Sequence, residues 1–201
     1  MAAVSETLVR EYFELHGFFV GQQRKYVAPA RTAEEEEADF FVINPLYENA
    51  PGPPPFLLGS ADLARICRAV VVVKGWHTET FSATRLAQIP EIFRFVEPSA
   101  FAQAARAFGQ DGPVLKVMVV PALPQDAQAR DQTLDLLRSK GIDAVISFRT
   151  MLADLITQIE PNRNYQKSDL LQVIRILKNY DFLKDPQLEL FKGKRARGLK
   201  R

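Results

Sequence analysis

Cysteine, histidine and long apolar runs are all scarce in this chain, and each scarcity excludes a class of protein. The single cysteine, Cys67, has no partner for an internal disulfide, which is typical of the reducing cytoplasm. Two histidines and one cysteine are too few for a zinc site. No apolar run approaches the ~18 residues that span a bilayer, and the first residues lack the pattern of a secretory signal. We therefore expect a cytoplasmic protein with no membrane partner.

Charge is distributed unevenly along the chain. Residues 161–201 contain 11 Lys or Arg and 4 Asp or Glu, whereas residues 1–160 contain 15 and 20. A basic end on an acidic body indicates a polyanionic partner such as nucleic acid, although a tail that only keeps the protein soluble has the same composition. The candidate nucleic-acid contacts are the six cations of the last ten residues: Lys192, Lys194, Arg195, Arg197, Lys200 and Arg201.

Hydrophobic periodicity predicts an α/β protein. Apolar runs bounded by turn residues predict strands at 18–26, 39–44, 70–73, 113–121 and 142–148. Helical spacing predicts helices at 5–15, 62–67, 90–108, 125–140, 149–159 and 167–180, with Ser5 capping the first and Ser60 the second. This order predicts a three-layer sandwich in which helices flank a mixed sheet, with further helices at the C-terminus.

The same pattern divides the chain into three parts. Residues 1–160 would form the α/β domain, 161–191 a helical appendage, and 192–201 a disordered basic tail. The helix expected at 167–180 has more apolar residues than one narrow stripe needs. It is therefore a candidate docking helix for another protein or for a second copy of the chain.

Three polar residues are placed where they can meet in one cleft. Glu6 lies in the first helix, Asp39 opens a strand, and Lys74 ends the buried strand of four valines. Carboxylates at such a place would hold Mg²⁺ or Mn²⁺. The lysine would orient the attacking water or stabilise charge on a phosphate. Each residue also has a simpler interpretation, as a first-turn acid, a strand-entry residue and a solvated lysine respectively.

These residues resemble the PD-(D/E)XK nuclease superfamily. The resemblance rests on Glu6 in SETLVREYFELHGFFV, Asp39 in ADFFVINP and Lys74 in VVVVKGW, and covers roughly the first 120 residues. It implies a restriction-endonuclease-like core that acts on DNA by metal-dependent hydrolysis. Under this resemblance Glu6, Asp39 and a third acid would be the metal ligands, and Lys74 would be the catalytic lysine.

The sequence departs from the family at one position. The family's third motif is acid-X-Lys, and Val72 occupies the acid position here. Glu79 is the candidate replacement, provided that a bulge at Gly75 turns it to the face of Lys74. Glu11 and the run Glu34–Glu37 are weaker candidates. The chain is therefore either a nuclease with an altered site or a non-catalytic nuclease-like module that binds nucleic acid or another protein.

Overall fold

Residues 2–22, 38–47, 52–109 and 113–183 are described by the computed structural model of the chain. The chain divides into two units, Met1–Leu155 and Ile156–Arg201, which we call the sheet unit and the C-terminal unit. The expected basic tail, 192–201, lies outside the described residues. No helix among those described is long and apolar enough to cross a membrane.

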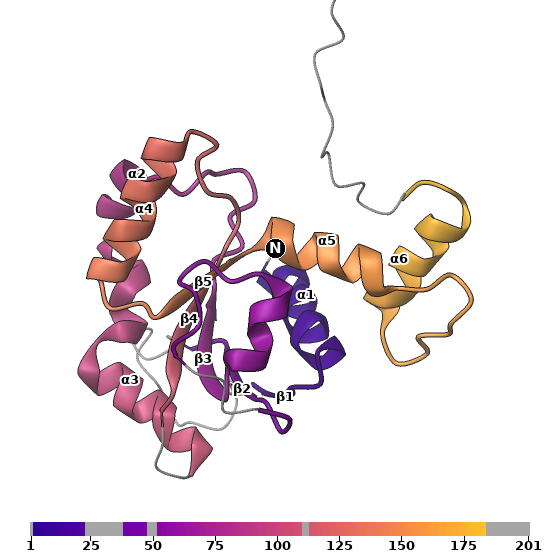
Figure 1. The fold of residues 1–201 in the computed structure, drawn as a ribbon, viewed down its shortest axis with the longest axis horizontal. Helices are drawn as coiled ribbons and strands as arrows, with labels where there is room; N and C mark the ends of the chain where they lie inside the picture. Colours follow the sequence, from indigo (N-terminus) through magenta and orange to yellow (C-terminus); the bar gives the residue numbers. More distant parts are fainter. Residues whose placement is uncertain (1, 23–37, 48–51, 110–112, 184–201) are drawn as a thin grey trace, which may run out of the picture. The chain divides into compact units, whose positions relative to one another are not determined.

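A five-stranded mixed sheet forms the centre of the sheet unit (Figure 1). Its strands lie side by side in chain order. The first three pair antiparallel, and the last three pair parallel. The strands are β1 (Phe19–Gly21), β2 (Phe40–Ile43), β3 (Arg68–Val73), β4 (Leu115–Val120) and β5 (Ala144–Ser147).

Helices precede, separate and follow these strands in the order that the sequence predicts. One helix comes before β1, a group of helices separates β3 from β4, and one helix separates β4 from β5. The helices are α1 (Ala2–Leu15), α2 (Ala83–Ala87), α3 (Pro98–Ala105), α4 (Ala127–Ser139), α5 (Phe148–Gln158) and α6 (Asp169–Asn179), with 3-10 turns η1 (Ser60–Arg65), η2 (Pro90–Val96) and η3 (Arg106–Phe108). The α/β class and the mixed sheet are thus confirmed, and the arrangement is compatible with three layers.

Strand alternation explains how the sheet is covered. Val72 and Met118 are paired across β3 and β4, and both point to the face where α2, η2 and α4 pack. Their neighbours Val71 and Val117 are also buried and point to the opposite face. Buried strands with β-branched residues on both faces are what a parallel segment of sheet requires. The core cluster on the first face consists of Val72, Phe81, Leu86, Ile89, Ile92, Phe93, Phe95, Met118, Val120, Leu137, Ile142 and Val145.

Two expected helix starts are wrong. Helix α1 begins at Ala2, so Ser5 lies inside the helix and is buried rather than capping it. The turn η1 begins at Ser60 and has Gly59 as its cap, which leaves the Ser60 hydroxyl to bond the hydroxyl of Tyr12 at 2.9 Å. In both cases the serine hydroxyl forms a hydrogen bond with a residue distant in the sequence instead of capping a helix.

Tyr12 supplies a prediction on alkaline stability. Burial raises the pKa of its phenol to about 12. The unfolded chain releases this proton near pH 10, so the folded state loses stability from about pH 10 upward, by at most about 3 kcal/mol once pH 12 is reached. Tyr12→Phe should remove this part of the loss. Urea unfolding at a series of alkaline pH values checks this, with Tyr180→Phe as the exposed control. An unchanged alkaline loss in Tyr12→Phe would contradict the assignment.

Candidate functional site

Two of the predicted site residues, Lys74 and Glu79, lie in the loop that follows β3. The strand itself ends at Val73, and the Lys74 amide extends its pairing by donating to the Val119 carbonyl at 2.9 Å. Two turns follow. The His77 backbone amide donates to the Gly75 carbonyl, and the Glu79 backbone amide donates to the Trp76 carbonyl, each at 3.0 Å. Gly75 therefore belongs to a loop and not to a strand. The bulge expected at Gly75 is wrong, because no strand continues through it.

The loop is fixed by its contact with α1. A Cβ atom on Gly75 would lie 2.8 Å from Ser5 Cβ and closer still to its hydroxyl, so only glycine allows the backbone to approach this helix. The Ser5 hydroxyl shares a hydrogen bond of 2.9 Å with His77 Nε2. The His77 ring in turn packs edge-on against Phe148, with centroids 4.6 Å apart. Nothing in the sequence indicates that His77 pairs with Ser5, which lies 72 residues earlier on the first helix.

Gly75→Ala is expected to lower the free energy of unfolding by about 1–3 kcal/mol, because the new methyl group overlaps with Ser5 and the loop must move. Gly59→Ala is the matched control, since a Cβ there meets only Asp62 at an ordinary 3.5 Å. Urea unfolding of both variants measures the difference. Equal stability of Gly75→Ala and wild type would show that the close approach is not rigid.

Asp39 and Lys74 lie at the same end of neighbouring strands. Asp39 immediately precedes β2 and Lys74 immediately follows β3, and these two strands are antiparallel. The Asp39 carboxylate accepts a hydrogen bond from the Val73 amide at 2.6 Å. The Asp39 amide donates to the Val71 carbonyl at 3.1 Å. The strand acid is thus bound to the backbone of the residue directly before the lysine.

Glu6 is bound to the end of a different strand. Its carboxylate accepts a hydrogen bond of 2.9 Å from the side-chain amide of Gln22, the residue after β1. The side-chain carbonyl of Gln22 accepts a hydrogen bond of 2.5 Å from the Arg10 guanidinium. Arg10 also lies over the ring of Phe40, 5.8 Å from its centroid. Glu6 therefore belongs to a polar group that joins α1 to β1 and β2.

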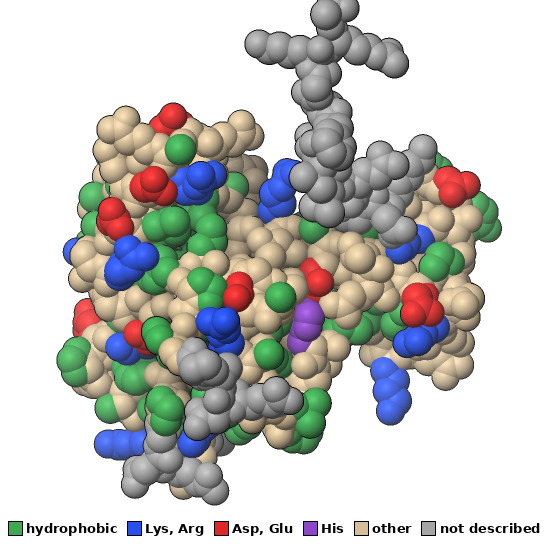
Figure 2. All heavy atoms as spheres, in the orientation of Figure 1, with side chains coloured by type: hydrophobic (Ala, Val, Ile, Leu, Met, Phe, Trp, Pro, Cys, Tyr) green, Lys and Arg blue, Asp and Glu red, His purple; other side chains and the backbone are tan. Residues whose placement is uncertain are grey.

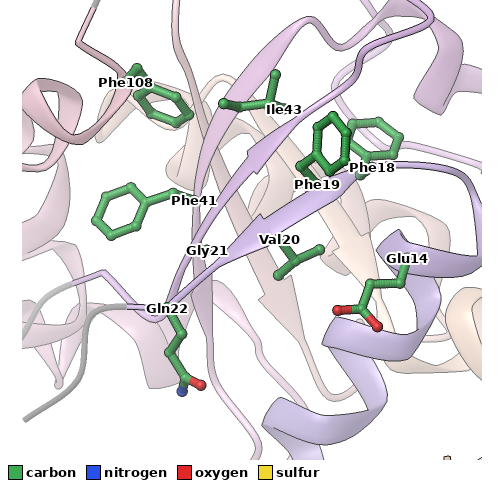
Figure 3. Close-up of a pocket in the computed structure, with 9 residues that line it drawn as sticks. All are labelled: Glu14, Phe18, Phe19, Val20, Gly21, Gln22, Phe41, Ile43 and Phe108. Atoms are coloured by element: carbon green, nitrogen blue, oxygen red, sulfur yellow. The ribbon is translucent and has the colours of Figure 1, made fainter. Parts of the chain in front are cut away.

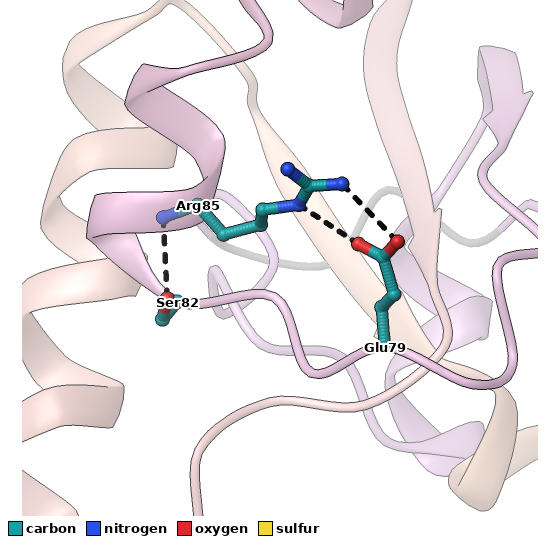
Figure 4. Close-up of polar contacts among 3 residues, drawn as sticks. All are labelled: Glu79, Ser82 and Arg85. Carbon is teal, nitrogen blue, oxygen red and sulfur yellow. Dashed lines mark hydrogen bonds and ion pairs between the residues drawn. The ribbon is translucent and has the colours of Figure 1, made fainter.

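Glu79 is held toward α2 (Figure 4). Its two carboxylate oxygens accept hydrogen bonds from Arg85, at 2.9 and 3.1 Å. The Arg85 backbone amide donates to the hydroxyl of Ser82, which caps α2. The hydrogen bond from Arg85 lowers the pKa of Glu79, so this acid stays ionised and paired. Sequence reasoning missed Arg85, although it lies only six residues after Glu79.

The expected magnesium set is not assembled. Across the part of the chain that the structure describes, no three His, Cys, Asp or Glu side chains are grouped so that they could hold a metal ion. Glu6, Asp39 and Glu79 each have a different hydrogen-bond partner. Glu11 joins no such group either, and Glu34–Glu37 lie outside the described residues. As the structure places them, these residues do not form a site for Mg²⁺ or Mn²⁺.

Val72, at the position where the resemblance expects an acid, is a core residue. Its side chain is only 1% exposed and belongs to the core cluster with Phe81 and Met118. A carboxylate at this place would be buried among apolar side chains without a partner, which is strongly unfavourable. The position at which the resemblance expects an acid is therefore part of the core.

A hollow at the edge of the sheet is lined by nine residues, and Lys74 is not one of them (Figure 3). It has a volume of about 770 Å³ and surrounds β1 at the edge of the sheet. Gln22, the partner of Glu6, is the member that connects it to the predicted site. The lining consists of Glu14, Phe18, Phe19, Val20, Gly21, Gln22, Phe41, Ile43 and Phe108.

Acidic and basic side chains are interspersed on the face of the sheet unit that Figure 2 shows. No field of one sign forms on this face. The excess of positive charge lies in residues 161–201, with 11 Lys or Arg against 4 Asp or Glu. The six candidate nucleic-acid contacts of 192–201 lie outside the described residues. Comparison of the chain with models of protein families, with curated proteins and with solved structures finds no match.

Proposed function

We propose that this chain is a PD-(D/E)XK-like protein that binds DNA without cutting it. One observation carries the proposal. Asp39 and Lys74 lie at the same end of neighbouring strands, as the resemblance requires, while Val72 is packed into the core at the position of the missing acid. The proposed restriction-endonuclease-like core is further supported by a helix and three antiparallel strands that precede a parallel pair.

Binding in this proposal is electrostatic. The sheet unit supplies Lys74 at the end of a buried strand, and the end of the chain supplies an excess of cations. Lysine and arginine that neutralise DNA phosphates release condensed counterions, which drives association and makes it depend on salt. No metal and no hydrolytic step are needed for this activity.

Titration of fluorescently labelled DNA with the full chain tests the proposal by anisotropy. Wild type should bind duplex DNA at low salt, and log K should fall linearly as log salt rises. Absence of binding to both duplex and single-stranded DNA at low salt would refute it. That result would favour the second candidate function.

The second candidate is an assembly module that docks through α6. Leu171 and Ile174 are buried in the C-terminal unit, whereas Val173 and Ile176 on the same helix are about half exposed. The helix thus has apolar residues beyond those it buries. Sedimentation across a wide range of concentrations tests this function. Self-association that Val173→Ser with Ile176→Ser abolishes would support it, and a monomer throughout would remove the second copy as the partner.

A further inference from the structure

Strand β1 lies at the edge of the sheet, and in the described part of the chain β2 is its one neighbour. Residues of an antiparallel pair point their backbone amides and carbonyls alternately toward and away from the neighbouring strand. The Asn44 amide donates to the Cys67 carbonyl at 2.8 Å and continues the register of β2 and β3. Alternation from this bond turns the amide and carbonyl of Val20 outward, away from β2. The Phe18 amide, two residues earlier, has the same direction and donates to the Phe13 carbonyl on α1 at 3.0 Å.

One face of β1 is apolar and partly exposed. Phe19 is 67% exposed, and Ile43, its partner on β2, is 37% exposed. Gly21 is paired with Phe41 on the same face, and a Cβ atom on Gly21 would lie no closer than 3.7 Å to Phe41, so there is room above this glycine. The Phe41 ring packs edge-on against Phe108, with centroids 5.8 Å apart. All five residues line the hollow of about 770 Å³, a volume typical of ligand sites.

The opposite face of β1 is next to an acid. Val20 is paired with Val42, and its side chain lies on the side of α1 (Figure 3). Glu14 of α1 lines the same hollow, with its carboxylate directed toward Val20, and it is the one charged residue of the lining. Burial and then the charge of Glu11 raise the pKa of the Glu14 carboxyl, and Arg10 offsets this only in part. A cation that reached this side of β1 would therefore be complementary in charge.

We propose that β1 binds an extended peptide segment of a partner protein as an added strand, with a lysine or arginine of the peptide facing Glu14 and apolar side chains on either side of it facing Phe19 and Phe41. Backbone hydrogen bonds to Val20 supply affinity, and the two faces of the strand supply specificity. Side chains alternate along a strand, so the peptide residue opposite Val20 lies on the Glu14 side and its two neighbours lie on the apolar face. The partner sequence therefore has the pattern apolar, cation, apolar. This interaction goes beyond the proposed DNA binding and does not depend on it.

The probe is the capped peptide Ser-Thr-Val-Lys-Phe-Thr-Ser, titrated into the full chain labelled with ¹⁵N. Binding should shift the amide resonance of Val20, and the titration gives the Kd. The isomer Ser-Val-Thr-Lys-Thr-Phe-Ser has the same composition but carries its apolar residues on the face of the lysine, so it should bind at least about 10-fold more weakly. Methylation of the lysine backbone nitrogen removes the hydrogen bond to the Val20 carbonyl and should weaken binding by a similar factor.

Variants of the chain test the two faces separately. Phe19→Ser should weaken binding of the peptide about 10-fold, because an apolar contact is lost. Phe182→Ser is the matched control, since Phe182 is 77% exposed and lies outside the hollow, and it should bind like wild type. Glu14→Lys should weaken the lysine peptide about 3-fold and should strengthen binding of the same peptide with glutamate in place of lysine, as an exposed ion pair predicts.

Each other outcome overturns the inference. If millimolar peptide leaves the Val20 resonance unchanged, β1 does not accept an added strand. Equal affinity of the isomer or of the methylated peptide would show that neither strand alternation nor the backbone hydrogen bond matters. If octylamine displaces the peptide and binds as tightly, the hollow takes a small amphipathic cation instead. If wild type sediments as a dimer that Phe19→Ser dissociates, the occupant of the edge is a second copy of the chain. DNA binding is measured separately, so none of these results decides the proposed function.

Discussion

Val72→Glu is expected to lower the free energy of unfolding by on the order of 4 kcal/mol at neutral pH, because it buries a charge among apolar side chains. Val72 is 1% exposed and is enclosed by residues such as Phe81 and Met118. The buried carboxyl would have a pKa above the ~4.3 of the unfolded chain. The loss should therefore be smaller in acid, where only the cost of the larger neutral side chain remains, and should grow as pH rises. Urea unfolding at several pH values measures it.

Val72→Gln is the matched control, since it has nearly the same size without the charge. Its cost should not vary with pH. Mg²⁺ should restore no stability to Val72→Glu, because the carboxylates of Glu6 and Glu79 are held by Gln22 and Arg85. A clear gain in stability with Mg²⁺ in Val72→Glu, absent in Val72→Gln, would reveal a latent metal site and contradict this account.

Glutamine at all six cations of 192–201 is expected to cause the largest loss of DNA affinity. Each phosphate contact contributes about −0.9 to the slope of log K against log salt on duplex DNA. If three of the six contact phosphates, the slope weakens by about 2.7, which corresponds to roughly a 500-fold loss at 0.1 M salt relative to 1 M. Anisotropy titrations at several salt concentrations give both quantities.

The control has the same number of glutamine substitutions, at three cations of the sheet unit, Arg94, Arg130 and Arg138, and at three neutral positions of the tail. These arginines lie outside the proposed contacts, so the slope should change little. An unchanged slope in the tail variant would show that other cations bind the phosphates. The proposed function would then have to rest on cations outside 192–201.

Much of the fold could be predicted from the sequence, because the spacing of apolar residues indicates which segments are buried strands or helices. The four valines before Lys74 and the run between Pro113 and Pro121 predict central strands, and both are buried in the sheet. The start of the helix expected at 167–180 is close to that of α6, which Ser168 caps by accepting a hydrogen bond from the Leu171 amide. The first and last residues of the helices and strands were harder to predict. Hydrogen bonding and side-chain contacts with distant segments decide where α1 begins and where β3 stops.

The contacts within the candidate site were harder to predict for the same reason. The sequence placed Asp39 and Lys74 on successive strands, and the antiparallel pairing brings their ends together. It gave no means of seeing that Arg85 holds Glu79, that Gln22 holds Glu6, or that Gly75 must touch α1. Spacing along the chain predicts which element carries a side chain. Its partner depends on packing between elements, which a single sequence does not specify.

Incubation of pure wild-type protein with DNA and Mg²⁺ or Mn²⁺ tests the central claim, binding without cutting, most directly. The DNA is recovered and its strands are separated by size. The account predicts that protein-bound DNA stays intact with either metal. Metal-dependent cleavage by wild type that is lost in Lys74→Ala would contradict it.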